Sequence, residues 1–474
     1  MAQQSTDPMT RTGPGLFAKL GTLSILYLSV FLTRIGFGTI LIIFPLYVAT
    51  PSSSLAAIII ALYPALEGFS ALPVGAVVDL RGRRRVFVTG MALISVLTFL
   101  IGLSNNLVLV GGAHALEGLA AAMVTIASLT MITDLTVEQN RGAGMGAFDL
   151  ANLAGYGVGI MLGTLFSKIF SSNLGDSFLV VSAIMGASSI FVYFVLREPG
   201  HASQGRRSLR QMYDSLTSDV VGILPIWFSL TIILGFYLFL PRLVAARTGV
   251  NDLSQSAGLL LLALLVFGAG ALMFGRLSDK IGRTKTVMIG AAGELGFLVI
   301  LPSLFERLVV IPQGTPLIES YRMVGPIIIV GGFLFFLGSA LIPSILAYIG
   351  DKASREFRGS AMGLYSLMLS GGITTGTILA GIADDLGGVQ AVFYSAAIIF
   401  SGLTLTSAWL LYGNSKTSRS KSPAQEQTRQ TNLTSRLSFA LFRGPVDQPG
   451  TQHRLLAEDR PLGTLPRTQN AGRH

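Results

Sequence analysis

The most informative segment of the sequence reads Gly75-Ala-Val-Val-Asp79-Leu-Arg-Gly82-Arg83-Arg84-Arg85. It recurs 200 positions later as Gly275-Arg-Leu-Ser-Asp279-Lys-Ile-Gly282-Arg283-Thr-Lys285, with glycine, aspartate, glycine and arginine at the same spacing. Each copy follows a long apolar run and ends in a basic residue. Self-similarity of this kind indicates an internal duplication, in which each copy lies at the same point of one half of the chain.

A second pair of segments supports the duplication. Asp134 precedes Arg141-Gly142, and Asp351 precedes Arg358-Gly359 at the same spacing. The offset is now 217 positions, which places an insertion of 17 residues between the two pairs. The segment 306–323 is the expected place of that insertion.

Composition excludes a water-soluble globule. Hydrophobic residues make up 51% of the 474 residues and charged residues only 12%, whereas soluble domains carry about 25% charged residues. The absence of cysteine excludes disulfides, thiolate metal sites and cysteine nucleophiles. The net charge is +10, but outside the tail the basic residues lie in loops between apolar runs rather than on one folded face. This distribution therefore indicates orientation in a membrane, and we expect no nucleic-acid partner.

Twelve apolar runs are long enough to cross the hydrocarbon of a bilayer, which takes roughly 20 helical residues. A bilayer offers no water to unpaired peptide groups, and the alternating pattern of a membrane barrel is absent, so we expect helices. We predict an all-α membrane protein with twelve transmembrane helices in two pseudo-symmetric six-helix bundles. The predicted spans are 22–48, 54–78, 86–104, 107–133, 142–168, 176–196, 220–246, 254–277, 285–305, 324–349, 359–383 and 388–413.

Lysine and arginine residues are divided unequally between the predicted loops. Eighteen fall on the side that holds the N-terminus and five on the other. This asymmetry predicts a multi-pass plasma-membrane protein with both termini in the cytoplasm. The predicted parts are a cytoplasmic N-terminal segment (1–21), a first bundle (22–196), a cytoplasmic linker (197–219), a second bundle (220–413) and a disordered basic tail (414–474).

The repeated segment resembles the signature loop of the major facilitator superfamily of secondary transporters. The shared pattern is Gly-x-x-x-Asp-x-x-Gly-Arg-(Arg/Lys)-(Arg/Lys) between spans 2 and 3, echoed between spans 8 and 9, and the resemblance covers roughly residues 20 to 413. It implies two bundles related by an axis along the membrane normal, a solute site between them near the midplane, and transport by alternating access. We expect the protein to act as a monomer.

The resemblance also implies a gating role for the charged groups of the repeated segments. In that family the loop aspartate caps a helix end of the opposite bundle and pairs with a nearby arginine, which closes the cytoplasmic side. A carboxylate is favoured at a helix N-terminus, and such contacts can form and break as the halves move. The alternative is charge that serves only orientation and capping. The expected gating residues are Gly75, Asp79, Gly82, Arg83, Arg84, Asp134, Arg141, Gly275, Asp279, Gly282, Arg283, Asp351 and Arg358.

Ionisable residues inside the predicted spans are costly and are therefore candidates for function. At about 1.5 Å of rise per residue, Glu67 lies roughly 18 Å from Asp79 along span 2, and Arg34 roughly 22 Å from Lys19 along span 1. We expect Arg34 and Glu67 to pair near the midplane, either as a static ion pair or as a solute or proton site that opens when loaded. Glu294 in span 9 is expected to be structural, because that span is peripheral in the family.

His114 and Glu117 lie three residues apart in span 4 and share one helical face. The drug-exporting branch of the family often shows Arg-x-x-Gln-Gly here, whereas this chain reads His114-Ala-Leu-Glu117-Gly118. Histidine titrates near neutral pH. Proton coupling by His114 or Glu117 and a merely satisfied polar pair therefore both stay open.

Span 5 carries Asp149, Asn152 and Tyr156 on one face. We expect this polar stripe to line the pathway of the solute or the proton. The exporting branch usually has a Gly-Pro kink in this span, but Ile160 follows Gly159 here, which weakens the assignment to that branch.

The chain has no nucleotide-binding motif, no nucleophile elbow and no His/Asp/Glu cluster at metal spacing. We therefore expect no enzymatic activity, no cofactor and no metal site, and a gradient must supply the energy. The expected partners are a small-molecule solute, protons or another coupling ion, and the lipid bilayer. Proton-linked export of drug-like compounds is slightly favoured over uptake of an anionic metabolite, which Arg34 would suit. A membrane receptor or scaffold and a membrane-embedded enzyme are the alternatives from other classes.

Overall fold

The computed structural model describes residues 16–48, 50–136, 141–198, 218–248, 253, 256–312, 315–352 and 358–419. All of them belong to one compact unit, Met1–Arg419. Most of the predicted N-terminal segment, linker and tail lies outside the described residues, so the predicted division into five parts stays a prediction.

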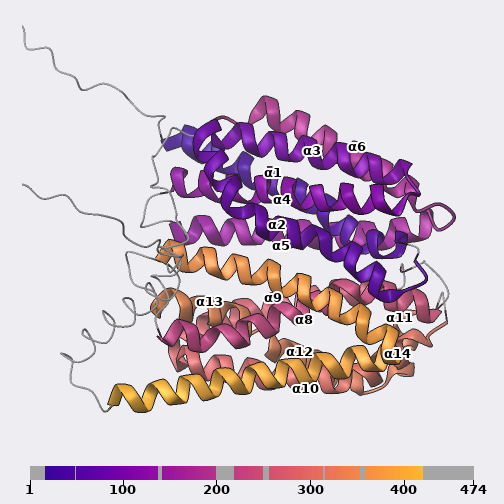
Figure 1. Ribbon diagram of the computed structural model, residues 1–474, viewed down its shortest axis with the longest axis vertical. Coiled ribbons are helices and arrows are strands. Elements are labelled where there is room, and N and C mark those ends of the chain that lie inside the picture. Colours follow the sequence, from indigo (N-terminus) through magenta and orange to yellow (C-terminus); the bar gives the residue numbers. More distant parts are fainter. Residues whose placement is uncertain are drawn as a thin grey trace, which may run out of the picture. The chain divides into compact units, whose positions relative to one another are not determined.

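The described residues form α-helices joined by short connections (Figure 1). The first half of the chain holds α1 (Leu16–Tyr47), α2 (Ser53–Arg81), α3 (Arg83–Leu103), α4 (Leu107–Leu135), α5 (Arg141–Ile169) and α6 (Gly175–Val195). The second half holds α8 (Ser218–Thr248), α9 (Ser256–Ile281), α10 (Arg283–Val309), α11 (Leu317–Val324), α12 (Ile327–Gly338), α13 (Leu341–Lys352) and α14 (Arg358–Arg419).

Eleven helical stretches within the described residues are long and apolar enough to cross a membrane. The last of them, in α14, contains two predicted spans, which meet where Gly387 and Gly388 leave helical geometry. Figure 1 shows α14 folding back on itself, with an orange arm (358–386) and a yellow arm (389–419). Counting both arms gives twelve crossings, so the all-α class and the predicted number of spans are confirmed.

The span predicted at 324–349 is present, but its helix starts later and is interrupted. Gly325 has a φ of 75° and separates α11 from Pro326, which precedes α12. At Ser339 the chain tightens, because the N–H of Ala340 donates to the carbonyl of Leu337, three residues earlier, at 3.1 Å. The crossing is therefore built from α12 and α13, with a break inside the predicted membrane region.

Equivalent helices of the two halves pack in the same way. α1 packs on α5, and α8 packs on the first arm of α14. A Cβ atom on Gly159 or Gly376 would collide with the backbone of the facing helix, so glycine permits the close approach. The hydroxyl of Thr39 donates to the carbonyl of Gly159, and that of Thr377 to the carbonyl of Gly235, both at 3.1 Å. The threonine lies on α1 in the first half but on α14 in the second, so it is the helix pairing and the close approach at Gly159 and Gly376 that correspond and support the duplication.

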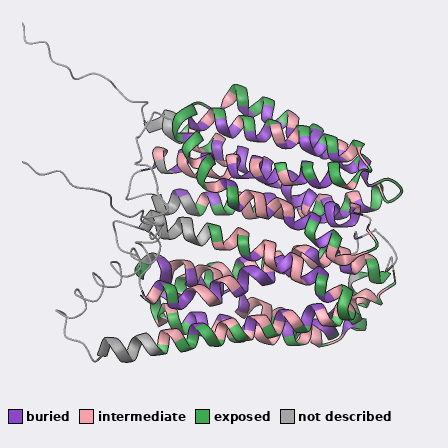
Figure 2. Ribbon diagram, in the orientation of Figure 1, coloured by how far each residue is buried: buried purple, intermediate pink, exposed green. Residues whose placement is uncertain are grey.

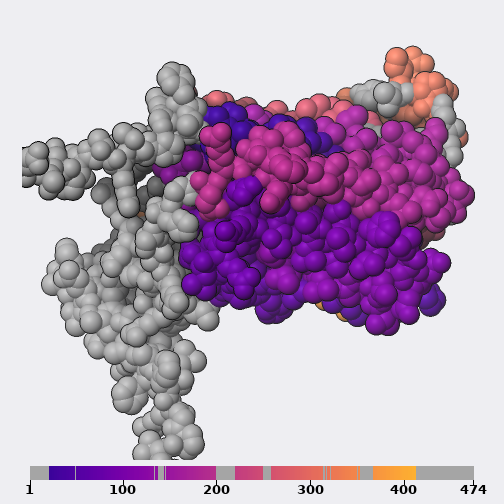
Figure 3. All heavy atoms as spheres, turned by 90° about the horizontal axis from the view of Figure 1, so that it is seen from above, coloured from indigo at the N-terminus to yellow at the C-terminus, as the bar shows by residue number. Residues whose placement is uncertain are grey.

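Buried residues gather between the helices, and exposed residues lie on their outward faces (Figure 2). The outward faces include large apolar side chains, among them Phe69, Val108 and Phe194, each more than three-quarters exposed. The side of the molecule built by the first-half helices is seen in Figure 3. Apolar side chains on such outward faces fit contact with lipid rather than water.

Candidate functional site

Arg83 is the central residue of the first signature segment (75–85). Its side chain is only 2% exposed, its Nε atom lies 3.0 Å from Asp134 Oδ2, and its Nη2 atom lies 3.8 Å from Asp79 Oδ1. Gly82 joins α2 to α3 with a φ of 90°, a backbone conformation that favours glycine. Burial raises the pKa of Asp134, and the charge of Arg83 opposes that rise. Three of the predicted gating side chains thus form one charge cluster within the first half.

The second signature segment (275–285) repeats this arrangement. The Nε atom of Arg283 lies 3.0 Å from Asp351 Oδ2, and its Nη1 atom lies 2.5 Å from Asp279 Oδ1. Gly282 has a φ of 99°, and Gly275 lies within α9. The side chains of Arg283 and Asp351 are 25% and 59% exposed, whereas those of the equivalent pair in the first half are 2% and 1% exposed. The two halves share the pairing, but only the first-half pair is shielded from water.

Glu198 is a further residue of this region, and sequence reasoning missed it. Its carboxylate accepts hydrogen bonds from the backbone N–H groups of Arg83 at 2.8 Å and Arg84 at 2.9 Å, and so caps the N-terminus of α3. The guanidinium of Arg84 donates to the carbonyls of Leu196 and Tyr193. Glu198 follows α6 in sequence, so only the fold brings it to α3.

The predicted contact between Asp79 and the opposite bundle stays a prediction. The described partner of Asp79 is Arg83 of its own half. The side chains of Arg141 and Arg358, at the starts of α5 and α14, lie outside the described part of the structure. A Cβ atom at Gly75 would meet open space, so the described structure gives no steric reason for glycine there.

Arg34 on α1 lies in a polar cluster with side chains of α4 and α5. Its Nε atom donates to Asn152 Oδ1 at 2.6 Å, Nη1 to the Tyr156 hydroxyl at 3.1 Å, and Nη2 to Thr125 Oγ1 at 3.0 Å. The guanidinium carbon also lies 5.1 Å from the ring centre of Phe37. We call Arg34, Thr125, Asn152 and Tyr156 the Arg34 cluster. All three acceptors are neutral, so the cluster carries the positive charge of its arginine.

The predicted direct ion pair between Arg34 and Glu67 is not formed. α1 packs tightly on α5 where Gly155 faces the Cβ atom of Arg34. This packing brings the guanidinium to Asn152 and Tyr156 instead. The prediction of direct contact was therefore wrong, because equal depth in the bilayer does not fix which neighbouring helix a side chain faces.

Glu67 nevertheless lies close enough to Arg34 for their charges to interact. Glu67 is partly exposed, and its carboxylate has no hydrogen bond to any residue in the described ranges. The next residue, Gly68, faces Ser370 on the first arm of α14. Glu67 therefore lies beside the interface between the two halves, where the resemblance to secondary transporters places a solute.

His114 and Glu117 form a buried pair. His114 Nδ1 lies 2.9 Å from Glu117 Oε2, and the Thr98 hydroxyl donates to Glu117 Oε1 at 2.6 Å. The ring of Phe44 stacks on the histidine with 3.6 Å between ring centres. Both carboxylate oxygens of Glu117 thus have partners, as the interpretation of a satisfied polar pair expects. A role in proton coupling stays a hypothesis.

The predicted polar stripe of span 5 divides into two parts. Asn152 and Tyr156 bind Arg34, whereas Asp149 is exposed and has no hydrogen bond to a residue in the described ranges. Asp149 lies nearer the start of α5, so the three side chains do not meet in one site.

Glu294 on α10 has contacts that the sequence did not predict. The residue is 3% exposed, and its Oε1 atom accepts a hydrogen bond from the Tyr237 hydroxyl on α8 at 3.0 Å. Its other oxygen packs against Gly338, where α12 ends. The expectation of a structural role fits these contacts and stays a prediction.

The two halves are joined at the end of the helices opposite to the signature segments. Asp385 accepts hydrogen bonds from the backbone N–H groups of Ser53 at 2.8 Å and Ser54 at 2.9 Å, and from the Ser52 hydroxyl at 2.9 Å. The hydroxyl of Ser54 also donates to Asp385, and that of Ser53 donates to Asp384 at 2.6 Å. We call these five residues the clasp. It places carboxylates of the second half at the N-terminus of α2, where the helix dipole favours them.

Arg242 on α8 strengthens the same end of the molecule. Its guanidinium donates to the backbone carbonyl of Val48 at 2.6 Å and to that of Thr50 at 2.8 Å. These carbonyls follow the C-terminus of α1, where a cation is favoured. Sequence reasoning missed both the clasp and Arg242, because their partners are far apart in the chain and have no local signal.

Within the part of the chain that the structure describes, no group of three or more His, Asp or Glu side chains could hold a metal ion. The site instead consists of ion pairs at one end, an inter-half clasp at the other, and charged residues between them inside apolar helices. These features define a polytopic membrane transport protein. The family model of the Major Facilitator Superfamily matches residues 26–317 and 314–456. The chain belongs to the Major Facilitator Superfamily, and it is a transporter rather than an enzyme.

Known proteins similar to this chain agree with that assignment. Multidrug resistance protein 2 of Bacillus subtilis (strain 168) is 21% identical over 81% of this chain and 94% of its own length. Multidrug resistance protein MdtG of Klebsiella pneumoniae (strain 342) is 23% identical over 81% of this chain and 92% of its own. The crystal structure of a bacterial homolog of the human lysosomal transporter Spinster, inward-facing and unoccupied, has a TM-score of 0.61 at 16% identity. It covers 85% of this chain and 99% of that one.

Proposed function

We propose that this chain is a proton-coupled secondary transporter of the plasma membrane that exports drug-like compounds by alternating access. Transport across a membrane follows from the family. The coupling ion, the direction and the solute are our proposal, as are the cytoplasmic position of both termini and the monomeric state. The observation that supports the proposal most is that Arg34 and Glu67 lie near each other inside predicted spans without a direct ion pair.

An ionisable side chain inside a bilayer is costly unless a partner neutralises it. The carboxylate of Glu67 has no hydrogen-bond donor among the described residues. A proton or a cationic group of a solute would therefore neutralise it. A proton and a cationic solute that compete for this carboxylate are coupled, because each binds when the other has left. Such competition exchanges protons for solute across the membrane.

The relatives named for multidrug resistance, although only 21% and 23% identical, support export of drug-like compounds. The apolar surroundings of the cluster support it as well, since Phe37 and Tyr63 pack edge to face with 5.9 Å between ring centres near Arg34. Aromatic walls with few polar groups are typical of sites for drug-sized ligands.

The clasp supports alternating access. It joins the two halves at one end of the helices, whereas the described ion pairs of the signature segments, Arg83 with Asp134 and Arg283 with Asp351, each join residues of one half. A conformation closed at the clasp end is one of the two that alternating access requires. The other would open the clasp and bring the two signature segments together.

A second candidate is uptake of a small anionic metabolite. The Arg34 cluster favours it, because all three described hydrogen-bond acceptors of the guanidinium are neutral and its charge has no direct counterion within the described residues. A carboxylate or phosphate of a solute would supply that counterion.

Flux into liposomes distinguishes the two candidates. An exchanger fills liposomes with an acidic interior, because departing protons drive solute entry, whereas proton-linked uptake of an anion requires an acidic exterior. We expect the wild type to accumulate cationic dyes in acid-interior liposomes and Glu67→Gln to lose that accumulation while eluting as folded protein. The matched control is Glu306→Gln, which removes an exposed carboxylate bonded to Gln390. Wild-type flux by Glu67→Gln would contradict the proposal, and anion entry driven by an acidic exterior and lost in Arg34→Gln would establish the second candidate.

A further inference from the structure

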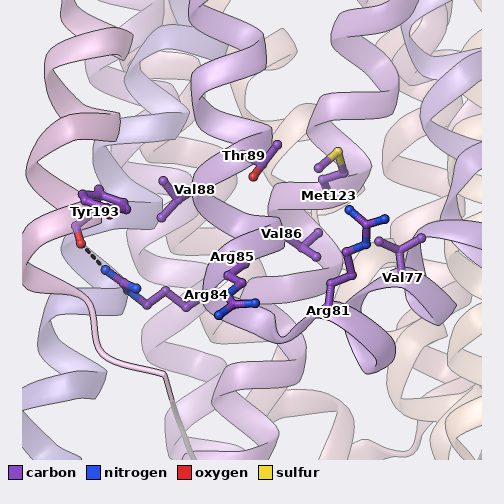
Figure 4. Close-up of a pocket in the computed structure, with 9 residues that line it drawn as sticks. All are labelled: Val77, Arg81, Arg84, Arg85, Val86, Val88, Thr89, Met123 and Tyr193. Carbon is purple, nitrogen blue, oxygen red and sulfur yellow. Dashed lines mark hydrogen bonds between the residues drawn. The ribbon is translucent and has the colours of Figure 1, made fainter.

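A hollow of about 370 Å³ opens at the signature end of the first half. Figure 4 shows Arg81 and Arg84 on its two sides, with Arg85 between them. Helices α2, α3, α4 and α6 supply its wall. The lining residues are Val77, Arg81, Arg84, Arg85, Val86, Val88, Thr89, Met123 and Tyr193.

The arginines in this wall are arranged so that they can bind an anion. Arg81 and Arg85 are exposed, and neither forms an ion pair or a side-chain hydrogen bond with a residue in the described ranges. Arg84 is held in place by the carbonyls of Leu196 and Tyr193 and lies 5.1 Å from the centre of the Tyr193 ring.

Two acidic groups of the same region already have partners. Glu198 accepts the backbone N–H groups at the start of α3, and Asp79 lies in the ion pair of Arg83. The hollow therefore keeps an excess of positive charge.

The rest of the wall is apolar. Val77, Val86, Val88 and Met123 line the hollow beside the arginines. Arg81 ends α2 and Arg84 lies in the first turn of α3, so the charges lie at the ends of two membrane-length helices, where lipid headgroups gather. A phosphate beside the arginines and an acyl chain along the valines would use both parts of the wall, whereas a free anion would use only one.

The two signature segments place their basic residues differently. At the offset of 200 positions, Arg81 corresponds to Ile281 and Arg84 to Thr284, and only Arg85 has a basic counterpart, Lys285. Both segments carry the shared glycines, aspartate and arginine. The second segment has basic residues of its own at Arg276 and Lys280, so the two segments differ in where their basic residues lie, and only the first places three arginines around a described hollow.

We propose that this hollow binds the headgroup of an anionic phospholipid, with its phosphate at Arg81 and Arg85 and its acyl chain against Val77, Val86 and Met123. Anionic headgroups are attracted by clustered basic residues at the membrane surface. This inference does not rest on the identity of the transported solute.

Native mass spectrometry of the delipidated full chain tests the proposal, with dioleoylphosphatidylglycerol, dioleoylphosphatidylcholine and inorganic phosphate as probes. We expect the anionic lipid to bind the wild type about tenfold more tightly than the neutral lipid. The double variant Arg81→Gln/Arg85→Gln should lose that preference. Val77→Trp, which fills the hollow and keeps the arginines, should weaken both lipids.

The matched control is Arg276→Gln/Lys285→Gln, which removes two exposed charges from the second signature segment and should bind lipid as the wild type does. An equal loss in this control would overturn the proposal, because charge anywhere at this end would then suffice. Inorganic phosphate that displaces the lipid at similar concentration would identify a site for free phosphate instead. Unchanged binding by Arg81→Gln/Arg85→Gln would place the lipid elsewhere.

Discussion

Asp385 Oδ1 accepts a hydrogen bond from the backbone N–H of Ser53 at 2.8 Å, and this bond crosses from the second half of the chain to the first. The family resemblance leads one to expect a carboxylate on a helix N-terminus of the opposite bundle at the signature end. The clasp uses the same chemistry at the other end, because Ser53 begins α2 and Arg81 ends it. The two ends of one helix would then take part in the two alternating closures.

Replacing Asp385 by Asn should loosen the clasp. The amide keeps the size of the side chain but has one acceptor oxygen and no charge, so the N–H groups of Ser53 and Ser54 cannot both keep their partner. The chain has no cysteine, so a single cysteine at Ser370 reports opening from the clasp end. A membrane-impermeant maleimide added on that side should react severalfold faster in Asp385→Asn than in the wild type.

The matched control for this measurement is Asp176→Asn. Asp176 lies at the start of α6, also at the clasp end, but accepts its side-chain hydrogen bond from Asn173 of the same half. Its replacement should leave the maleimide rate unchanged. Equal rates in Asp385→Asn and the wild type would mean that the clasp does not hold the two halves together.

The pH dependence of the clasp follows from its hydrogen bonds. Those from Ser54, followed by those from Ser52 and Ser53, hold the pKa of Asp385 well below its usual range. A carboxyl with a depressed pKa stabilises the closed clasp at every pH above its ordinary pKa of about 3.9, and that contribution is lost as pH falls through the lower value. The maleimide rate at Ser370→Cys, corrected for reagent reactivity, should therefore be constant from neutral pH down to about 5. A midpoint near neutrality would show that another group controls opening.

The signature pairs of the two halves should differ in their contribution to stability. Asp134→Asn removes the closer of the two described carboxylate partners of the buried Arg83 guanidinium, and loss of one partner of a buried ion pair costs about 3 to 5 kcal/mol. Asp351→Asn breaks an exposed pair, which contributes about 0 to 1 kcal/mol. Thermal unfolding in detergent should therefore show the larger loss for Asp134→Asn. Equal decreases in unfolding temperature in the two variants would mean that burial of the Arg83–Asp134 pair does not increase its contribution to stability.

Glu117→Gln should affect stability more than transport. Glu117 accepts from Thr98 and pairs with His114 inside the first half, and the amide has no charge and only one acceptor oxygen, so these buried contacts should weaken by about 1 to 3 kcal/mol in total. We expect a lower unfolding temperature and flux that still responds to a pH gradient. Unchanged stability together with loss of the pH response would assign proton coupling to this pair instead of Glu67.

Most of the fold was predictable because membrane spans are set by local composition. Runs of about 20 apolar residues must form helices in a bilayer, so the predicted spans agree with helices such as α2 and α4 to within a few residues. The break at Ser339 was not predicted from the sequence, since it lies inside a long apolar run; in the structure Glu294 of α10 packs against Gly338 there.

Duplication marked Arg83, Asp134 and their counterparts as candidates, but the sequence did not predict that Arg83 pairs with Asp134, because 51 positions separate these two residues and 68 separate Arg283 from Asp351. The partners of Arg34 were not predictable, since depth along a helix leaves its rotation undetermined. The clasp could not be predicted from the sequence either. Ser53 and Asp385 are separated by 332 positions, and neither stands in a recognisable motif.

The central claim is that the two halves open at one end while they close at the other. Double electron–electron resonance tests it with two label pairs in the cysteine-free chain in liposomes: Asn105→Cys with Val310→Cys across the clasp end, and Arg197→Cys with Lys280→Cys across the signature end. Introducing Asp385→Asn should lengthen the first distance and shorten the second in the same population of molecules. A lengthened first distance with an unchanged or longer second distance would contradict alternating access by these two halves.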